Sequence, residues 1–264
     1  MNGKLTTSMT EGNEDMHNKD LYNELCRNAL QYDRLYHYTS LEALDIILAN
    51  RSLRLSSLIK VNDPQENKRI TSIWNKKVFV ACFTNTLDNS DYFFANYGKV
   101  RITFLNKIEH SDIFFDSTLK FKVIDFHLDC KSESDLEYKS YSNDQDWCLF
   151  DVSFADVYYT NDLDFHISSD GFESNAGLIK QKSGIDNKGI SRDWSVEKES
   201  RLRVAVRPIA LEAVSEGNDF KYPKPPFDYL YISIKNLIVK IELCDLCAST
   251  ERIAFDKIIE KYGY

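Results

Sequence analysis

The stretch from Leu35 to Ser57, LYHYTSLEALDIILANRSLRLSS, predicts a strand, a helix and a second strand in direct succession. Its first strand ends in four polar residues, His37, Tyr38, Thr39 and Ser40. Thr39 is followed three residues later by Glu42, which is the capping-box pattern of a helix N-terminus. Since a helix N-terminus favours anions, the polar cluster either binds a ligand or only caps the helix.

Apolar spacing supports these three elements and continues beyond them. Four residues recur at helical spacing and should face a core: Leu41, Leu44, Ile47 and Leu48. Leucines on both sides of Arg54 are typical of a strand. Further strands are expected at residues 77–84, 100–104, 118–127, 148–159 and 229–243, and helices after Asp20 and after Ser249. Elements that mix without regular alternation indicate an α+β fold.

Two later segments have contrasting patterns. Residues 160–193 are polar and without a clear period, so we expect a long loop that could include one short helix. The following stretch, DWSVEKESRLRVAV at 193–206, alternates strictly and predicts one strand. Four charged residues would then share one face of that strand: Glu197, Glu199, Arg201 and Arg203.

Composition indicates an ordinary globular chain. Of its 264 residues 43% are hydrophobic, and Gly and Pro number only 9 and 5. We interpret residues 1–19 as a mobile polar tail and 20–264 as a single domain. The net charge of -8 disfavours a nonspecific nucleic-acid coat, although a local patch could still bind nucleic acid. We see no export signal or membrane-spanning apolar run, so we expect a cytoplasmic protein with its six cysteines reduced.

Several standard motifs are absent from the sequence. There is no GxGxxG, no Walker-type loop, no HExxH and no GxSxG, which argues against Rossmann dehydrogenases, P-loop NTPases, zincins and α/β-hydrolases. The five histidines lack metal-ligand spacing, and we predict no metal site. The lone CxxC of Cys244 and Cys247 is weak evidence for zinc, and two buried small hydrophobes are the better interpretation.

Three candidates for a functional site remain, and each has a plain structural explanation. His37 alone could be a half-buried histidine that hydrogen-bonds to backbone. The aromatic segment 92–97 could simply belong to the core. Glu197 and Glu199 could form the solvated face of a strand, paired with Arg or Lys on a neighbouring strand. Considered singly, none of the three outweighs its structural explanation.

Together, these segments resemble a known family. The blocks LYHYTSLEALDIILANRSLRLSS, NDPQE, VACFT, FFANYG and WSVEKESR follow in the order seen in the bacterial family called domain of unknown function 2971. The resemblance runs from about Leu35 to Arg203, and one departure is Phe94, where that family has tryptophan. It brings Asn62 and Asp63, from the NDP-x-E block, into the set of cofactor-binding candidates.

The first unit and the late Glu-x-Glu also resemble the ADP-ribosyltransferase superfamily of the histidine-tyrosine-glutamate type, which implies two packed, mostly antiparallel sheets with flanking helices. By that resemblance His37 would bind the adenosine-side ribose of NAD, and the Tyr38 backbone would hold the nicotinamide amide. Glu199 would be the catalytic glutamate, with Glu197 beside it. The remaining implied NAD-binding positions are Thr39, Ser40, Thr84, and Phe94 or Tyr97 as the ring that stacks on nicotinamide. Arg54 and the helix N-terminus are our candidates for binding the pyrophosphate.

These residue types suit the chemistry of NAD. Nicotinamide leaves as a neutral molecule, and the barrier lies in the positive charge that develops on the ribose, which a carboxylate stabilises. We therefore expect an NAD-dependent ADP-ribosyltransferase, a toxin or defence effector, that modifies a protein side chain or a nucleic-acid base. An NAD glycohydrolase and a non-catalytic module that binds a nucleotide or a partner protein remain the alternatives. An antitoxin or regulatory protein is a further partner that the sequence leaves open.

Overall fold

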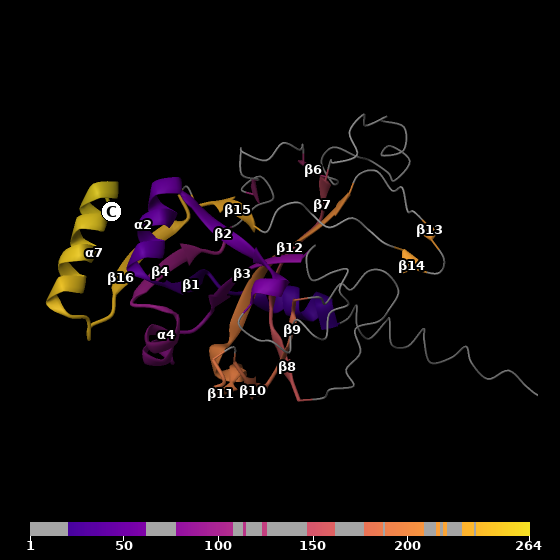
Figure 1. Cartoon of the computed structure of the whole chain (residues 1–264), viewed down its shortest axis with the longest axis horizontal. Coiled ribbons are helices and arrows are strands. Elements are labelled where there is room, and N and C mark those ends of the chain that lie inside the picture. The colour runs from indigo at the N-terminus through magenta and orange to yellow at the C-terminus, as the bar shows by residue number, and fades with distance from the viewer. Residues whose placement is uncertain are drawn as a thin grey trace, which may run out of the picture.

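The computed structural model describes residues 21–61, 78–107, 113–114, 123–125, 147–161, 177–186, 188–208, 215–216, 219–220, 229–234 and 236–264. The predicted tail at 1–19 and the candidates Asn62 and Asp63 lie outside these residues. The fold is built on one large, mostly antiparallel sheet of ten described strands with helices beside it (Figure 1). The α+β class is thereby confirmed.

The main path of the sheet runs through seven strands. In spatial order these are β16 (Ile238–Leu243), β4 (Val100–Leu105), β1 (Arg34–Thr39), β3 (Val78–Thr84), β12 (Glu199–Pro208), β7 (Trp147–Asp156) and β6 (Val123–Asp125). Three more strands branch from β3, in the order β2 (Ser52–Ser57), β15 (Tyr229–Ser233) and β5 (Ile113–Phe114). Within this sheet only the β6–β7 pair is parallel among the described pairs.

Three two-stranded sheets complete the described strands. They are β8 (Tyr158–Thr160) with β9 (Ile179–Gln181), β10 (Ser183–Ile185) with β11 (Ser191–Asp193), and β13 (Ser215–Glu216) with β14 (Asp219–Phe220). The β8–β9 pair is parallel and the other two are antiparallel. Within 177–193, strands therefore replace much of the loop that the sequence predicts, because short pairs satisfy backbone groups in a segment that lacks an apolar period.

The sheet divides at β3. One edge of this strand pairs with β12 along its whole length, from Val78 to Thr84. The other edge pairs with β1 at Thr84 and with β2 at Phe79 and Val80. Two arms result, β1–β4–β16 and β2–β15–β5. Where two packed sheets were expected, the described strands are joined by hydrogen bonds into one branched sheet, because β3 is long enough to pair with both arms.

Helices α2 (Leu41–Asn50) and α4 (Ser90–Tyr97) pack on the arms of this sheet. The helix α2 buries Leu44, Ile47 and Leu48, as its period predicts, and α7 (Ser249–Tyr262) lies beside it (Figure 1). Residues 21–29 are also helical, and the short helix α4 follows β3. Short 3-10 turns form η1 (Leu58–Lys60) and η3 (Trp194–Glu197). No helix among the described residues is long and apolar enough to cross a membrane.

One apolar core holds both arms together. It contains side chains from α2 and from the strands of each arm, including Leu35, Leu55, Phe79, Ile102, Leu202 and Leu230. In β3, Phe79, Ala81 and Phe83 belong to this core, while Val78 and Val80 enter a second apolar cluster on the other face. The predicted burial of this strand on both faces is confirmed. Cys244 and Cys247 are buried free thiols, also as predicted.

Two local predictions are wrong. The N-cap of α2 is Ser40 and not Thr39: its hydroxyl accepts a hydrogen bond from the backbone N–H of Ala43 at 3.2 Å. Thr39 remains the last residue of β1, because the chain leaves the strand one residue later than the capping-box pattern suggests. The single strand expected at 193–206 is interrupted by η3 and by Lys198, whose φ of 40° is left-handed.

Candidate functional site

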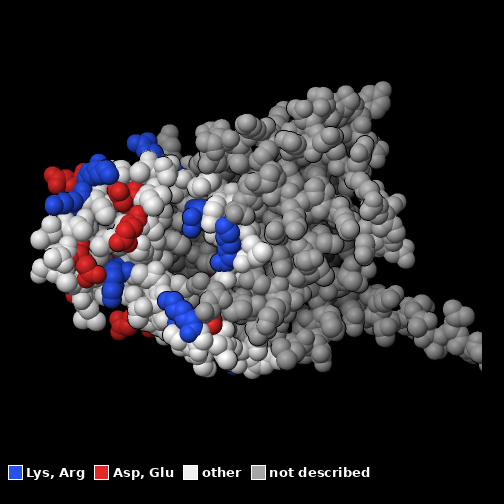
Figure 2. Space-filling view, viewed as in Figure 1, with Lys and Arg blue, Asp and Glu red and all other residues white. Residues whose placement is uncertain are grey.

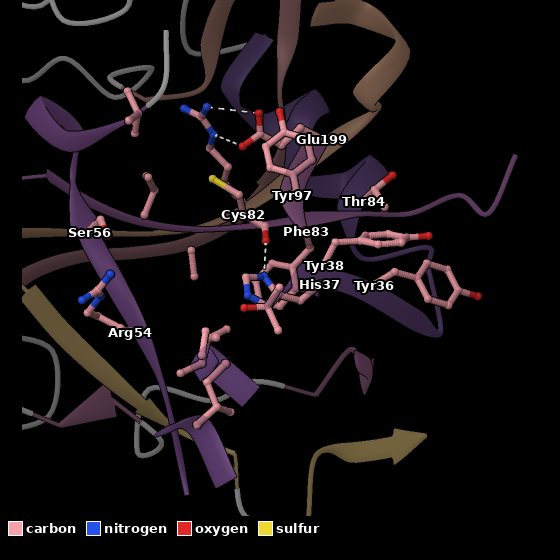
Figure 3. A pocket seen from close by; sticks show the side chains of 18 of the residues that line it. Tyr36, His37, Tyr38, Arg54, Ser56, Cys82, Phe83, Thr84, Tyr97 and Glu199 are labelled. Atoms are coloured by element: carbon pink, nitrogen blue, oxygen red, sulfur yellow. Dashed lines mark hydrogen bonds and ion pairs between the residues drawn. The ribbon is translucent and has the colours of Figure 1, made fainter. Parts of the chain in front are cut away.

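A pocket of about 430 Å³ lies where the two arms separate from β3. Its walls come from β1, α2, β2, β3 and α4, and its polar end is formed by Lys180, Glu197, Glu199 and Arg201. Figure 3 shows the pocket, with Arg54 and Glu199 on different sides of it. On the face in Figure 2, Lys and Arg side chains lie beside a hollow in the surface, over β2. The branch of the sheet therefore creates the space that the candidate residues line.

His37 is placed by β1 and fixed by β3. Its Nδ1 lies 2.9 Å from the carbonyl oxygen of Cys82, drawn as a dashed line in Figure 3. A carbonyl can only accept, so Nδ1 carries the proton. Burial lowers the pKa of His37, although the Cys82 carbonyl opposes this, so the ring is neutral near pH 7. The Nε2 atom is then left as a hydrogen-bond acceptor, suited to a ligand hydroxyl.

Glu199 begins β12 and is held by two cations. Arg201 donates from Nε to one carboxylate oxygen at 2.7 Å and from Nη2 to the other at 3.1 Å. Lys180 Nζ lies 3.2 Å from that second oxygen. A further Arg201 bond, from Nη1 to the carbonyl oxygen of Gly177 at 2.7 Å, fixes the guanidinium. Glu199 is therefore a rigidly held carboxylate that is only 6% exposed.

Glu197 lies on η3 and reaches the same ammonium from the other side. Its Oε2 is 2.8 Å from Lys180 Nζ. Its Oε1 accepts hydrogen bonds from the hydroxyls of Tyr97 and Tyr92, the latter at 3.2 Å. Helix α4 therefore fixes Glu197 through two phenols, and β9 fixes it through Lys180. The two glutamates converge because Lys180 links them, and not because both lie on one face of a strand as predicted.

The charges of this cluster compensate one another. Burial would raise the pKa of Glu199, but Arg201 and Lys180 outweigh it and hold the pKa well below the usual value of 4.5. Burial would lower the pKa of Lys180, but Glu199 and Glu197 raise it overall. Burial and the charge of Glu197 raise the pKa of Tyr92 to about 12, so that phenol stays a donor. Glu199 and Lys180 are therefore both ionised at neutral pH.

Most of the predicted site residues line this one pocket. Those that do are His37, Tyr38, Thr39, Arg54, Thr84, Tyr97, Glu197 and Glu199. Arg54 is exposed, and its guanidinium lies over the ring of Tyr229 at 4.3 Å from the centroid. Thr84 is buried, and its hydroxyl donates to the carbonyl oxygen of Lys198 at 3.4 Å. Residues far apart in the chain are therefore brought together as the sequence motifs suggest.

Phe94 and Ser40 are the exceptions among the described candidates. Ser40 is occupied as the N-cap of α2, and neither residue is part of the pocket lining. Phe94 instead meets the ring of Tyr38 edge-on, with centroids 5.0 Å apart, because Tyr38 packs into the aromatic face of α4. Of the two candidate stacking rings, only Tyr97 is at the pocket. The hydroxyl of Tyr38 donates to Ser90, so the contribution of Tyr38 to a ligand would come from its backbone.

The backbone of β1 near Tyr38 supports such a contribution. On the edge that faces β3, β1 has a described strand partner only at Tyr36, opposite Thr84. The other edge pairs with β4 over all six residues. Because β1 separates from β3 after this pair, the backbone edge of its last three residues has no neighbouring strand among the described residues and is next to the pocket.

Sequence reasoning missed Lys180 and misjudged Arg201. Lys180 lies in the polar segment that was interpreted as a loop, and a single lysine there carries no motif. The structural explanation for the charged face of β12 assumed solvated side chains, yet Arg201 and Arg203 are each 1% exposed. The charged residue at every second position from 197 to 203 was the available signal, since a buried strand face can hold such a row only when its charges are paired.

The described residues contain no group of His, Cys, Asp and Glu side chains that could hold a metal ion. Cys82 lines the pocket, but burial raises the pKa of its thiol well above 9.0, which makes it a poor nucleophile. Comparisons of the chain with protein-family models, with curated proteins and with solved structures found no match. The resemblance of its motifs to the family named above therefore stays a prediction.

Proposed function

We propose that the protein is an NAD-dependent ADP-ribosyltransferase that transfers ADP-ribose to a macromolecular acceptor. One observation carries this proposal: His37, Tyr97 and Glu199, which come from three segments far apart in the chain, line a single pocket. A volume of about 430 Å³ is within the range of small-molecule sites, roughly 300–1,000 Å³. The resemblance of the sequence motifs to NAD-cleaving enzymes supports the same substrate.

The ends of the pocket suit different parts of NAD. Arg54 and Lys60 flank the ring of Tyr229 on the side of β2 and would attract the pyrophosphate. The Nε2 atom of neutral His37 would accept a hydrogen bond from a ribose hydroxyl. Tyr97 would contact the nicotinamide ring near the two glutamates. The site would then hold the glycosidic bond close to Glu199, in an orientation that lowers the entropic part of the barrier.

The proposed reaction breaks the bond between ribose C1′ and the nicotinamide nitrogen. Its electron pair goes to that nitrogen, which turns the cationic ring into neutral nicotinamide, so the leaving group needs no proton. The ribose becomes positively charged, and the carboxylate of Glu199 stabilises it. A nucleophilic atom of the acceptor then bonds to C1′ and loses its proton to Glu197 or to water. The products are nicotinamide and ADP-ribosylated acceptor.

NAD hydrolysis is the second candidate, and the hydrogen bonds of Glu197 favour it. Both carboxylate oxygens of Glu197 already accept hydrogen bonds, from the two tyrosines and from Lys180. Activation of a macromolecular acceptor by Glu197 would require one of these bonds to exchange. A water molecule is smaller than a macromolecular acceptor and could reach C1′ from solvent without displacing these hydrogen bonds. A non-catalytic binding module is the remaining alternative, and it predicts no role for the charge of Glu199.

The test compares the wild-type protein with Glu199→Gln, which keeps the side-chain shape but removes the charge. We expect wild type to release nicotinamide from NAD and the variant to lose at least about 100-fold in rate, as for loss of one strong electrostatic contact. Asp88→Asn is the matched control, because the Asp88–Lys198 ion pair is exposed. Equal rates in wild type and Glu199→Gln, with both proteins folded, would exclude the proposed role of Glu199.

NAD labelled in its adenine separates the two enzymatic candidates. A transferase leaves the label on a macromolecule from a cell extract, and a glycohydrolase leaves it on free ADP-ribose. A toxin or defence effector is the biological role that the motif resemblance supports. Expression of wild type should then slow the growth of a bacterial host, while expression of Glu199→Gln should not.

A further inference from the structure

Lys180 lies at the centre of the carboxylate cluster, although it comes from a different part of the chain. It is on β9, which pairs with β8 so that Lys180 is opposite Tyr159. Its side chain is 6% exposed, and its ammonium lies 4.4 Å from the ring centroid of Trp194. Burial of a lysine costs free energy unless its charge is compensated, so the contacts of Lys180 indicate its role.

The ammonium touches both glutamates at once. Nζ is 2.8 Å from Oε2 of Glu197 and 3.2 Å from Oε2 of Glu199. The other partners divide between the two carboxylates: Arg201 holds Glu199, while the two tyrosines of α4 hold Glu197. Lys180 donates hydrogen bonds to both carboxylates and so joins them. The backbone alone would not align them, because the left-handed Lys198 separates the 3-10 turn from the strand.

We propose that Lys180 is a positioning residue for the proposed reaction, whose ammonium holds Glu197 and Glu199 together as an ionised pair at the end of the pocket. The kinetic part of this inference, the effect of Lys180 on the reaction rate, rests on the proposed function. Its electrostatic part, the effect of Lys180 on the charges of the two carboxylates, follows from the contacts alone. Two glutamates and two cations make a neutral group of four, and removal of the lysine leaves two buried carboxylates with Arg201 as the remaining cation of the group.

Such a group responds to loss of the lysine by taking up a proton. Two neighbouring buried carboxylates with one cation cannot both remain ionised near neutral pH, so the pair binds a proton with a raised pKa. The titratable and charged groups that face the pair come from five elements. They are Lys180 on β9, Tyr159 on β8, Cys82 on β3, Tyr92 and Tyr97 on α4, and Arg201 on β12.

The experiment compares wild type with Lys180→Met, Lys180→Arg and the control Lys182→Met, in which an exposed lysine two residues away is replaced. Nicotinamide release and thermal unfolding are measured from pH 5 to pH 8. For Lys180→Met we expect the acidic limb of the kcat–pH profile to move to higher pH by about one to three units. Lys180→Arg, which keeps the charge, should restore the position of the limb, and Lys182→Met should match wild type.

Thermal unfolding gives an independent readout. In Lys180→Met the pKa of the pair is raised in the folded state, so its contribution to stability is present at low pH and is lost as pH rises. The difference in Tm from wild type should therefore increase from pH 5 to pH 8. A Tm difference that is constant with pH would overturn the electrostatic part of the inference, and an unmoved kinetic limb would overturn its kinetic part.

The outcomes separate this inference from the proposed function. If wild type releases no nicotinamide at any pH, the proposed function fails, and the Tm series alone decides whether Lys180 keeps the carboxylates ionised. If Lys180→Met does not fold, Lys180→Gln is compared with Lys180→Arg over the same pH range. If wild type is active and Lys180→Met or Lys180→Gln loses rate by the same factor at every pH, Lys180 is only structural.

Discussion

Replacement of Arg201 by methionine should be strongly destabilising. The side chain is 1% exposed, and it makes two hydrogen bonds to Glu199 and one to the carbonyl oxygen of Gly177. Its removal leaves Glu199 buried with Lys180 as its remaining counter-charge. Breaking a buried ion pair by removal of one partner costs about 3–5 kcal/mol. For a domain of this size that corresponds to a decrease in Tm of about 6–20 °C.

Urea unfolding of four proteins tests this value: wild type, Arg201→Met, Glu199→Gln and the double variant. The double variant should be less destabilised than the sum of the single variants, because the carboxylate that Arg201 neutralises is then uncharged. The exposed pair Lys198–Asp88 provides the control, and Asp88→Asn should cost less than about 1 kcal/mol. A loss below about 1 kcal/mol for Arg201→Met, or strict additivity in the double variant, would refute this account of the buried pair.

Three further predictions concern other parts of the site. His37 is neutral in the folded state because burial lowers its pKa below 6.5. Folding stability should therefore fall as pH drops below 6.5, and urea unfolding of His37→Gln should show a weaker pH dependence than that of wild type. Gly98→Ala should destabilise the protein by about 1–3 kcal/mol, since φ is +132° and a Cβ would lie 2.3 Å from the Thr39 backbone. Thermal unfolding measures this loss, and the control Gly263→Ala, where a Cβ meets nothing within 4 Å, should cost less. Arg54→Ala should weaken NAD binding in calorimetry about 10-fold or more with an unchanged Tm, whereas unchanged affinity would remove Arg54 from the site.

Much of the site could be predicted from local patterns. The β1–α2–β2 unit follows from apolar spacing and a polar cap, and only the choice between Thr39 and Ser40 as N-cap was wrong, since both side chains can cap a helix. The presence of His37 and Glu199 at one pocket is the long-range relation that the order of the motifs suggested. Such patterns succeed where the apolar face of a single element decides the structure.

The remaining features depend on contacts between distant segments. The branch at β3 requires two strands to share one edge, and no pattern within β3 encodes which neighbour takes which half. The η3 turn before Glu199 depends on Lys198 adopting a left-handed conformation, which alternation of apolar and charged residues does not reveal. The role of Lys180 depends on its contacts with Glu197 and Glu199, which are 17 and 19 residues away in the sequence. Pairing of buried charges is a property of the assembled fold.

The central claim is that Glu199 acts on the glycosidic bond of NAD within this pocket. A crystal structure of Glu199→Gln with NAD tests it most directly, because the variant should bind NAD without cleaving it. The account predicts nicotinamide beside Tyr97, the pyrophosphate near Arg54 and ribose C1′ about 3–3.5 Å from the side chain at position 199. NAD bound with its adenine at that position, or an empty pocket at saturating NAD, would contradict it.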